Sequence, residues 1–277
     1  MNHQTQHTFS AVVVAGAIML SGFIGLLHQP TAAFAAGSGS GSATDDTITA
    51  EATLEVPPQA ATDTCTWRVV TSITKTPGPS AGPITVRTRN GVRETLYAKY
   101  CNGVSTYHWI SDNTAPQAAS KANDKVSKLI PMLVARTAPD AAHQVVNVGT
   151  WFWVPKLMWK PISVTAYIVA GEAVIRITTT ATPTNVVYSP GDGNEPVICR
   201  GPGTPWTSSN GDNDTSSCMY TYRSASHTQP SGVFKSKTSI EWKITWTSNL
   251  GARGNLGTVR LGLNSNVRVL EMQALSR

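Results

Sequence analysis

The sequence of 277 residues lacks the short motif that marks P-loop nucleotide-binding proteins. It has no G-x-x-x-x-G-K-[ST] string, whose backbone N–H groups and lysine would hold phosphates. Beyond residue 36 the chain has only three histidines, His108, His143 and His227, and none lies in a recognisable catalytic motif. We therefore expect no nucleotide, no cofactor and no catalysis, and we keep a secreted hydrolase as a further alternative.

Charged residues are also scarce, and they do not cluster. Only 14% of residues are charged, and 22 Lys and Arg against 16 Asp and Glu give a net charge of +6. A basic balance favours anionic surfaces, but a nucleic-acid reader gathers its positive residues into a stripe. Because no run of three Lys or Arg occurs, the composition predicts a basic exported protein without a nucleic-acid partner.

The first segment of the chain has the layout of an export signal. Residues 9–27 (FSAVVVAGAIMLSGFIGLL) carry no charge, and residues 33–35 (AFA) have the small-x-small pattern that signal peptidase reads. We predict a signal peptide over residues 1–36. The alternative is an uncleaved anchor with membrane association through residues 9–27, a run close to the roughly 20 residues that span a bilayer. Residues 37–64 are small, polar and proline-containing, which predicts a flexible linker.

The four cysteines are widely spaced and all follow the export signal. An even count in an exported chain predicts disulfides, and four cysteines allow three pairings. The simplest pairs Cys65 with Cys101 and Cys199 with Cys218, because each bridge then stays within one region. No C-x-x-C pair occurs, so a structural zinc site is not expected. The predicted localisation is secreted or associated with the cell envelope.

Residues 65–147 predict a small β unit followed by a helix. β-Branched and aromatic stretches alternate with turn signals at Asn90-Gly91 and Asn102-Gly103. Residues 116–134 change to helical spacing, with apolar side chains at positions 118, 122, 126, 129, 130 and 133. Pro131 is expected to end or kink this connector helix.

Residues 148–277 predict strands throughout. The run SIEWKITW at residues 239–246 places its isoleucines and tryptophans on one face and its polar side chains on the other, as in a half-buried antiparallel strand. Short strands separated by turns, without helices between them, predict a β-sandwich. The predicted fold is therefore mainly β: a C-terminal β-sandwich, a small disulfide-stapled N-terminal β unit and one connector helix.

A stretch rich in glycine and proline, residues 186–206 (VVYSPGDGNEPVICRGPGTPW), has three interpretations. A phosphate-binding loop would need a lysine or a following helix, and both are missing. A calcium site would draw on oxygen donors here and at residues 212–214, but they lack the spacing of an EF-hand loop, so we expect no metal. A tight turn fits best, with positive φ at Gly191 and Gly193 and the Asp192 carboxylate accepting backbone N–H bonds.

Several motifs resemble a group of uncharacterised secreted or envelope proteins of actinobacteria that carry a C-terminal PKD-like, immunoglobulin-like domain. These motifs are TWFWVP at residues 150–155, the GDG turn at 191–193, CRGPGTPW at 199–206, CMYTY at 218–222 and EMQAL at 271–275. The resemblance implies a PKD-like sandwich over residues 148–277. It also implies surface display, adhesion or contacts with protein or carbohydrate, and not catalysis.

Tryptophans are the candidate contact residues. Trp151, Trp153 and Trp159 crowd a proline-bounded stretch, where core packing is the simpler interpretation and an exposed aromatic platform is the alternative. Trp206, after GPGTP, is the better candidate for an exposed ring. The expected function is a non-catalytic, envelope-associated interaction or structural module, for example in a surface secretion or pilus apparatus. The alternative is a carbohydrate-binding module, so the expected partner is an envelope protein or a cell-surface glycan.

Overall fold

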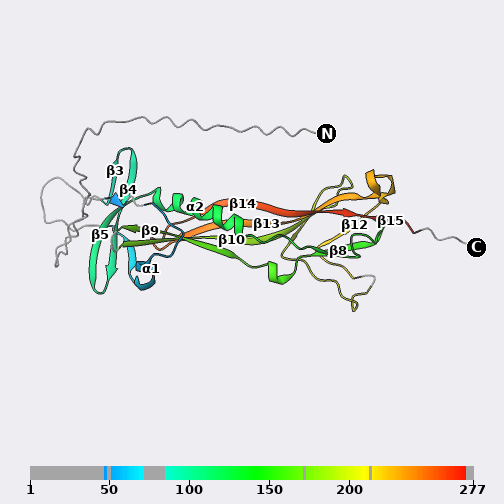
Figure 1. Ribbon diagram of the computed structural model, residues 1–277, viewed down its shortest axis with the longest axis horizontal. Coiled ribbons are helices and arrows are strands. Elements are labelled where there is room, and N and C mark those ends of the chain that lie inside the picture. Colours follow the sequence, from blue (N-terminus) through cyan, green and yellow to red (C-terminus); the bar gives the residue numbers. More distant parts are fainter. Residues whose placement is uncertain (1–46, 49–50, 72–84, 171–172, 212–213, 273–277) are drawn as a thin grey trace, which may run out of the picture. The chain divides into compact units, whose positions relative to one another are not determined.

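The structure is a computed structural model that describes residues 47–48, 51–71, 85–170, 173–211 and 214–272 (Figure 1). The export signal predicted for residues 1–36 lies outside these ranges. Within them the fold is mainly β, as predicted, with two α-helices and two disulfides. No helix of the described ranges is long and apolar enough to cross a bilayer.

The N-terminal β unit is a five-stranded sheet containing two hairpins. Its strands are β1 (Thr47–Ile48), β2 (Thr66–Val69), β3 (Val86–Arg89), β4 (Val92–Cys101) and β5 (Val104–Ser111). Their order is β1-β5-β4-β2, with β3 also paired to β4. The hairpin turns lie at the predicted Asn-Gly pairs. Asn90 and Gly91 have φ of 51° and 76°, and Asn102 and Gly103 have φ of 48° and 82°, values that asparagine and glycine adopt readily.

A second sheet of long antiparallel strands forms the centre of the fold, and we call it the long sheet. Its strands are β9 (Ile162–Ala170), β10 (Ala173–Ser189), β11 (Val197–Arg200), β13 (Phe234–Ser248) and β14 (Arg253–Val267). Their order is β11-β10-β13-β14, and β9 also pairs with β10. The predicted alternation in β13 is confirmed, because Ile240, Trp242, Ile244 and Trp246 are all at most 7% exposed.

A bulge keeps both halves of β10 facing the same way. The register between β10 and β13 shifts between Pro183 and Asn185. Odd-numbered residues before the bulge and even-numbered residues after it therefore share the apolar face, which includes Ala181, Val186 and Tyr188. Without the extra residue, the second half of the strand would turn its apolar side chains to the opposite face.

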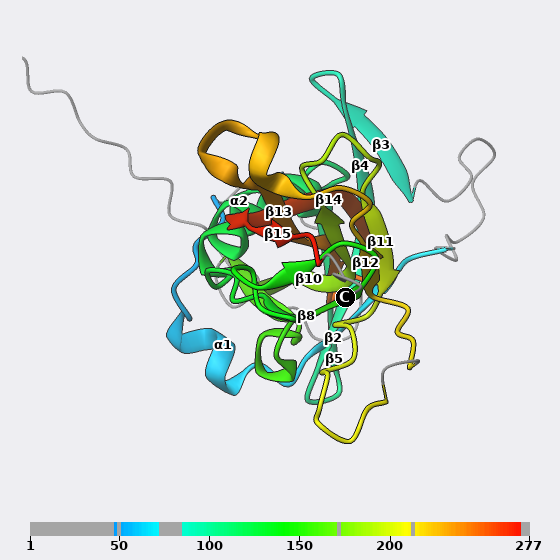
Figure 2. The ribbon, with the colours of Figure 1, turned by 90° about the vertical axis from the view of Figure 1, so that its right-hand side faces the viewer.

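A small sheet packs on one end of this apolar face. It consists of β6 (Arg136–Ala138), β8 (Gly149–Trp153) and β12 (Met219–Thr221), in the order β12-β8-β6. Beside it, β7 (Gln144–Val145) pairs in parallel with β15 (Val269–Leu270). Figures 1 and 2 show β8, β12 and β15 gathered at one end of the long sheet. Phe152 of β8 is fully buried in a cluster with Tyr188 and Trp242 of the long sheet.

The predicted connector helix is α2 (Thr114–Leu129), and it covers the middle of the apolar face. Its buried side chains are Ala115, Ala118, Ala119, Ala122 and Val126. Alanines let the helix lie close to the sheet, where Thr179 Oγ1 donates a 3.1 Å hydrogen bond to the Ala119 carbonyl. The helix ends before Pro131, which is one of the two outcomes expected at this proline, and it does not extend to residue 134. Leu129, expected on the buried face, is 48% exposed, because the chain leaves the helix there and buries Leu133 instead.

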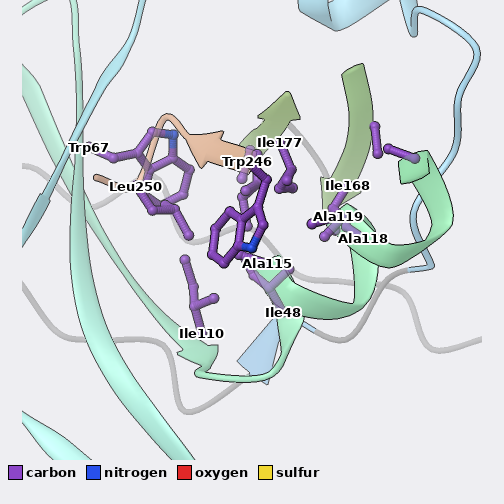
Figure 3. Close-up of a cluster of buried hydrophobic side chains, with 14 residues drawn as sticks. Ile48, Trp67, Ile110, Ala115, Ala118, Ala119, Ile168, Ile177, Trp246 and Leu250 are labelled. Carbon is purple, nitrogen blue, oxygen red and sulfur yellow. The ribbon is translucent and has the colours of Figure 1, made fainter. Parts of the chain in front are cut away.

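One hydrophobic cluster joins the two regions predicted as separate, residues 65–147 and 148–277. Trp67 and Ile110 of the N-terminal unit share it with the α2 alanines and with Ile177 and Trp246 of the long sheet (Figure 3). The predicted boundary at residue 148 therefore cuts through a common core. The reason is that the N-terminal unit and α2 cover the part of the apolar face that the small sheet leaves open.

The flexible linker predicted for residues 37–64 is wrong for the part that the structure describes. Ile48 is only 5% exposed and belongs to the shared core, and β1 pairs with β5. Thr53 exchanges two backbone hydrogen bonds of 2.7 Å with Tyr167 of β9. The composition predicted a tether, but backbone pairing needs no particular side chain, and a few apolar residues are enough to dock the segment.

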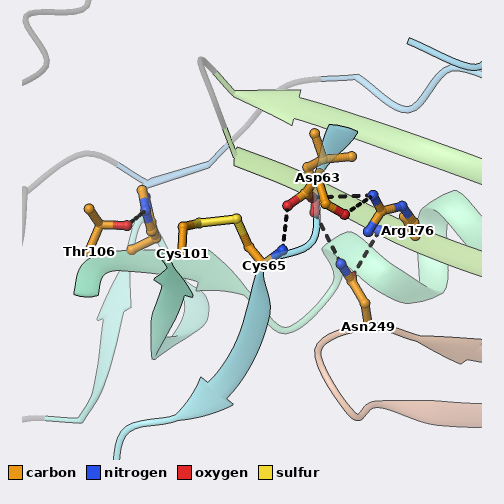
Figure 4. The surroundings of a disulfide bond; sticks show 8 residues. Asp63, Cys65, Cys101, Thr106, Arg176 and Asn249 are labelled. Atoms are coloured by element: carbon orange, nitrogen blue, oxygen red, sulfur yellow. Dashed lines mark hydrogen bonds and ion pairs between the residues drawn. A yellow bond between two sulfur atoms is a disulfide. The ribbon is translucent and has the colours of Figure 1, made fainter. Parts of the chain in front are cut away.

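Helix α1 (Pro58–Thr62) and the residue after it are held by an arginine of the long sheet. Arg176 Nη2 donates 3.0 Å hydrogen bonds to the carbonyls of Ala60 and Asp63, and it lies 3.4 Å from an Asp63 carboxylate oxygen. The other Asp63 oxygen accepts the backbone N–H of Cys65 (Figure 4). This segment therefore links the long sheet to the disulfide of the N-terminal unit.

Both predicted disulfides are present. Cys65 is bonded to Cys101 and Cys199 to Cys218, with Cα–Cα distances of 4.6 Å and 5.5 Å, and no cysteine is free. Each bridge lies within one region of the chain, which was the simplest of the three pairings. Two disulfides are compatible with an oxidising environment.

The tight contact between α2 and the sheet gives a test of the shared core. Ala119→Leu adds a large side chain at a fully buried position, so we expect it to lower the free energy of unfolding by about 1–3 kcal/mol. Lys125→Leu adds leucine to the exposed side of the same helix and should change it by less than about 0.5 kcal/mol. Urea unfolding of both variants measures this, and equal effects would contradict the packing described.

Candidate functional site

The GDG stretch forms a tight turn after β10. Gly191 and Gly193 have φ of +81° and +93°. A Cβ at Gly191 would lie 2.3 Å from the backbone oxygen of Lys235, whereas a Cβ at Gly193 would meet nothing within 4 Å. The Asp192 carboxylate accepts the backbone N–H of Asn194 at 3.1 Å. The turn therefore lies directly against β13, and the Asp192 carboxylate stabilises the loop to which it belongs.

Tyrosine hydroxyls tie this turn to the small sheet. The Tyr220 hydroxyl donates to Asp192 Oδ2, which also accepts from the Asn194 amide. The Tyr222 hydroxyl donates a 3.1 Å hydrogen bond to the Pro190 carbonyl and lies 2.8 Å from the hydroxyl of Tyr188. Both carboxylate oxygens of Asp192 therefore accept hydrogen bonds from other groups of this protein.

The same tyrosines belong to a chain of aromatic contacts between the two sheets. The ring centroids of Phe152 and Tyr188 are 4.8 Å apart, and those of Tyr222 and Phe234 are 5.4 Å apart, both stacked. Tyr220 meets the Tyr222 ring edge-on at 4.8 Å. Aromatic pairs of this kind add to the energy of burial. The turn and its tyrosines therefore brace the small sheet on the long sheet.

Burial changes the acidity of these tyrosines. Burial, followed by the hydrogen bond to Asp192, raises the pKa of Tyr220 to about 12. Burial is also the main cause that raises the pKa of Tyr188 and of Tyr222 above the usual value for tyrosine. These phenols are therefore hydrogen-bond donors at neutral pH, and they are poor candidates for bases or nucleophiles.

Metal-ligating side chains gather at one place among the described residues, Asp63 with Cys65 and Cys101. Both sulfur atoms there are joined in the disulfide, so they do not offer thiolates to a metal. Among the oxygen donors considered for calcium, the Asp192 carboxylate already accepts hydrogen bonds from Asn194 and Tyr220. Residues 212 and 213 lie outside the described ranges.

The outer face of the small sheet carries a hollow of about 860 Å³, which we call the groove. One wall comes from β6, β8 and β12, and the other from the loop between Cys199 and Cys218, residues 200–217, which we call the disulfide loop. Alternation along β8 turns Phe152 toward the long sheet and Trp151 toward the groove. Met219 lies opposite Trp151 in the ladder and lines the groove with it.

The disulfide loop is held against β8 by its backbone. Val154 N donates a 2.7 Å hydrogen bond to the Pro202 carbonyl. Gly203 has φ of +80°, and a Cβ there would lie 2.6 Å from the carbonyl oxygen of Phe152, so glycine is required for this approach. Further along, Asp214 Oδ2 accepts from Asn210 and from the backbone N–H of Gly211.

The tryptophans predicted as contact residues separate into two groups. Trp206 is 42% exposed and lines the groove together with Trp151, whose ring is almost covered at 6% exposed. Trp153 follows on the same strand and is half-buried, outside the groove lining. Trp159 packs against the core cluster around Trp242. The groove is thus lined by one buried tryptophan, Trp151, and by one exposed tryptophan, Trp206.

The remaining lining is apolar or uncharged, with one exception. Val148 is 45% exposed there, and Asn147 accepts a 3.1 Å hydrogen bond from Arg223 through Oδ1. Threonine hydroxyls of Thr215 and Thr221 add donors and acceptors. Among the described residues, Asp214 is the charged residue of the lining, and neither lysine nor arginine contributes to it. Sequence reasoning missed most of these residues, because only pairing of β8 with β12 brings them together.

The histidines of the described residues lie outside the groove. Of the three histidines, His108 hydrogen-bonds Thr106 in β5, and His143 pairs with Asp140; neither lines the groove, and nor does His227. The sequence also holds a G-x-S-x-G string at residues 78–82 (GPSAG). This spacing marks a serine nucleophile only between a strand and a helix. These residues lie outside the described ranges.

Comparison with known proteins finds no matching family model, no similar curated protein and no similar solved structure.

The two glycines of the turn provide a matched test of its geometry. Gly193→Ala strains the backbone alone, and we expect a loss of roughly 1–2 kcal/mol in unfolding free energy. Gly191→Ala has a similar φ and also drives a Cβ into the backbone of Lys235, so its loss should be clearly larger. Chemical denaturation compares the two, and an equal or smaller loss at Gly191 would refute the close approach to β13.

Tyr220 should make stability depend on alkaline pH. Its pKa of about 12 in the folded protein exceeds the value of about 10 for an unfolded chain. The neutral phenol is therefore favoured by folding, so this contribution is complete below about pH 10 and is lost as pH rises toward 12. We expect Tyr220→Phe to remove one late-ionising phenol from the ultraviolet titration of the folded protein. A titration in which all phenols of the variant and parent ionise alike would contradict this.

Proposed function

We propose that this protein is a non-catalytic binding module that works outside the cytoplasm, at the cell envelope, and holds its ligand in the groove. The observation that carries the proposal is the hollow of about 860 Å³ with Trp206 and Trp151 in its lining. Its size falls within the range of roughly 300–1,000 Å³ in which proteins bind small ligands. A concave site with aromatic walls and few polar groups is suited to binding.

A neutral glycan is the ligand class that fits the lining best. No lysine or arginine of the described ranges lines the groove, which disfavours phosphates, nucleotides and acidic sugars. Sugar rings present apolar C–H faces that stack on tryptophan, and the half-exposed ring of Trp206 offers such a surface. Asn147, Asp214 and the threonine hydroxyls supply the acceptors and donors that sugar hydroxyl groups need.

The setting at the envelope rests on the sequence and the disulfides together. Residues 9–27 have the pattern of an export signal, and the two disulfides suit an oxidising compartment. The resemblance to actinobacterial envelope proteins with a PKD-like domain points the same way. On this basis we propose that the chain is exported and displays the groove at the cell surface.

A segment of an envelope protein is the second candidate ligand. Val148 is 45% exposed at the groove, and Met219 adds a flexible apolar side chain to its wall. Aromatic grooves of this kind also accept extended, proline-rich peptides. Such a partner would suit a structural role in a surface apparatus.

Trp206→Ala tests the proposal. We expect it to weaken binding of a neutral cell-wall polysaccharide by roughly tenfold, because it removes the exposed stacking surface. The matched control is Tyr100→Ala, which removes an aromatic ring that is also 42% exposed but lies on β4 of the N-terminal unit. Calorimetric titration against a panel of neutral polysaccharides measures both. No binding by the parent protein, or binding that does not depend on Trp206, would contradict the proposal.

A further inference from the structure

The strand β14 forms an open edge of the long sheet. It pairs with β13 along its length, and within the described residues no strand lies on its other side. The side chains from Gly257 to Asn264 are exposed except at Val259, which is half-buried. An edge strand presents unpaired N–H and C=O groups, and proteins usually protect such edges by charge, proline or a covering element.

Two exposed leucines make this edge unusual. Leu261 and Leu263 are 37% and 42% exposed, and both lie on the side of β14 that continues the apolar face of β13. The charged side chain nearest to them, Arg260, does not protect the edge from pairing with another strand. Arg260 turns back onto its own sheet, where its Nε and Nη2 both lie 2.8 Å from the Glu241 carboxylate. The stretch from Thr258 to Asn264 therefore combines a row of backbone groups that no described strand pairs with an apolar stripe formed by Val259, Leu261 and Leu263.

We propose that β14 pairs antiparallel with β14 of a second copy of this protein, centred on Leu261. In this register Leu261 lies opposite Leu261 of the second copy, and Val259 lies opposite Leu263. On the other face Arg260 lies opposite Gly262, which leaves room for its side chain, and Thr258 lies opposite Asn264. The two long sheets then form one continuous sheet across a twofold axis.

The side chains themselves select this register. A shift that centres the pair on Gly262 keeps two apolar pairs, Leu261 with Leu263 and its symmetry mate, but leaves Val259 opposite Ser265. A shift that centres it on Arg260 places two arginines side by side, and like charges directly opposite one another are destabilising. Only the register centred on Leu261 pairs all six apolar side chains of the two stripes while keeping the arginines apart.

A cysteine scan tests both the dimer and its register. In the proposed pair, the Cα atoms at position 261 are about 4.5–5.5 Å apart, within the reach of a disulfide. We therefore expect Leu261→Cys to form a covalent dimer under mild oxidation. The matched variant Leu263→Cys should not, because the two positions are four residues apart along the ladder, roughly 13 Å. Cross-linking at 263 but not at 261, or at neither position, would overturn the proposal.

Sedimentation equilibrium of the purified protein gives an independent measurement. We expect a dimer in the parent protein, and Leu261→Lys should weaken its association by roughly tenfold or more, because two lysines then face one another. Leu157→Lys changes a leucine that is 77% exposed elsewhere and should leave the association unchanged. Thermal unfolding checks that both variants fold. A parent protein that is monomeric across the concentration series would overturn the proposal. This also holds if β14 of the monomer pairs with a strand of another protein.

Discussion

The fold depends on one constraint, the need to cover a single apolar face that runs the length of two long strands. β10 has 17 residues and β13 has 15, and alternate side chains of both are buried on the same side. No other single element in the described part of the chain is long enough to cover this face. The small sheet covers one end, α2 covers the middle and the N-terminal unit covers the other end. The bulge between Pro183 and Asn185 keeps the face continuous, because its extra residue turns the apolar side chains of the second half of β10 to the same side as those of the first half.

The groove follows from the way the small sheet meets this constraint. A strand has two faces, and β8 uses one of them to bury Phe152 against Tyr188. Its other face, which carries Trp151, is left for the disulfide loop to flank. The brace of Tyr220, Tyr222 and Asp192 fixes the small sheet on the long one, so the groove has one rigid wall. The disulfide Cys199–Cys218 ties the opposite wall, the disulfide loop, to the small sheet.

Local patterns in the sequence predicted local structure well. The Asn-Gly turns, the alternation in β13, the helix that ends before Pro131 and the two disulfides all depend on neighbouring residues or on simple pairing rules. The errors concern long-range contacts. Nothing local predicts that Ile48 joins a core with Trp246, or that backbone pairing docks Thr53 on β9. The groove was only partly foreseen: Trp206 stood out in its loop, whereas Met219 and Val148 become groove residues through pairing between strands far apart in the chain.

Native-state hydrogen exchange tests the shared face most directly. If the long sheet and its covers form one cooperative unit, backbone amides of β10 on either side of the bulge should exchange through the same global opening. As denaturant rises, their opening free energies should converge on one value with one slope. The contradicting result is that amides near Ile177 exchange by a separate, lower-energy opening while those near Val186 stay protected. That outcome would mean that the N-terminal unit and its half of the sheet fold as an independent domain.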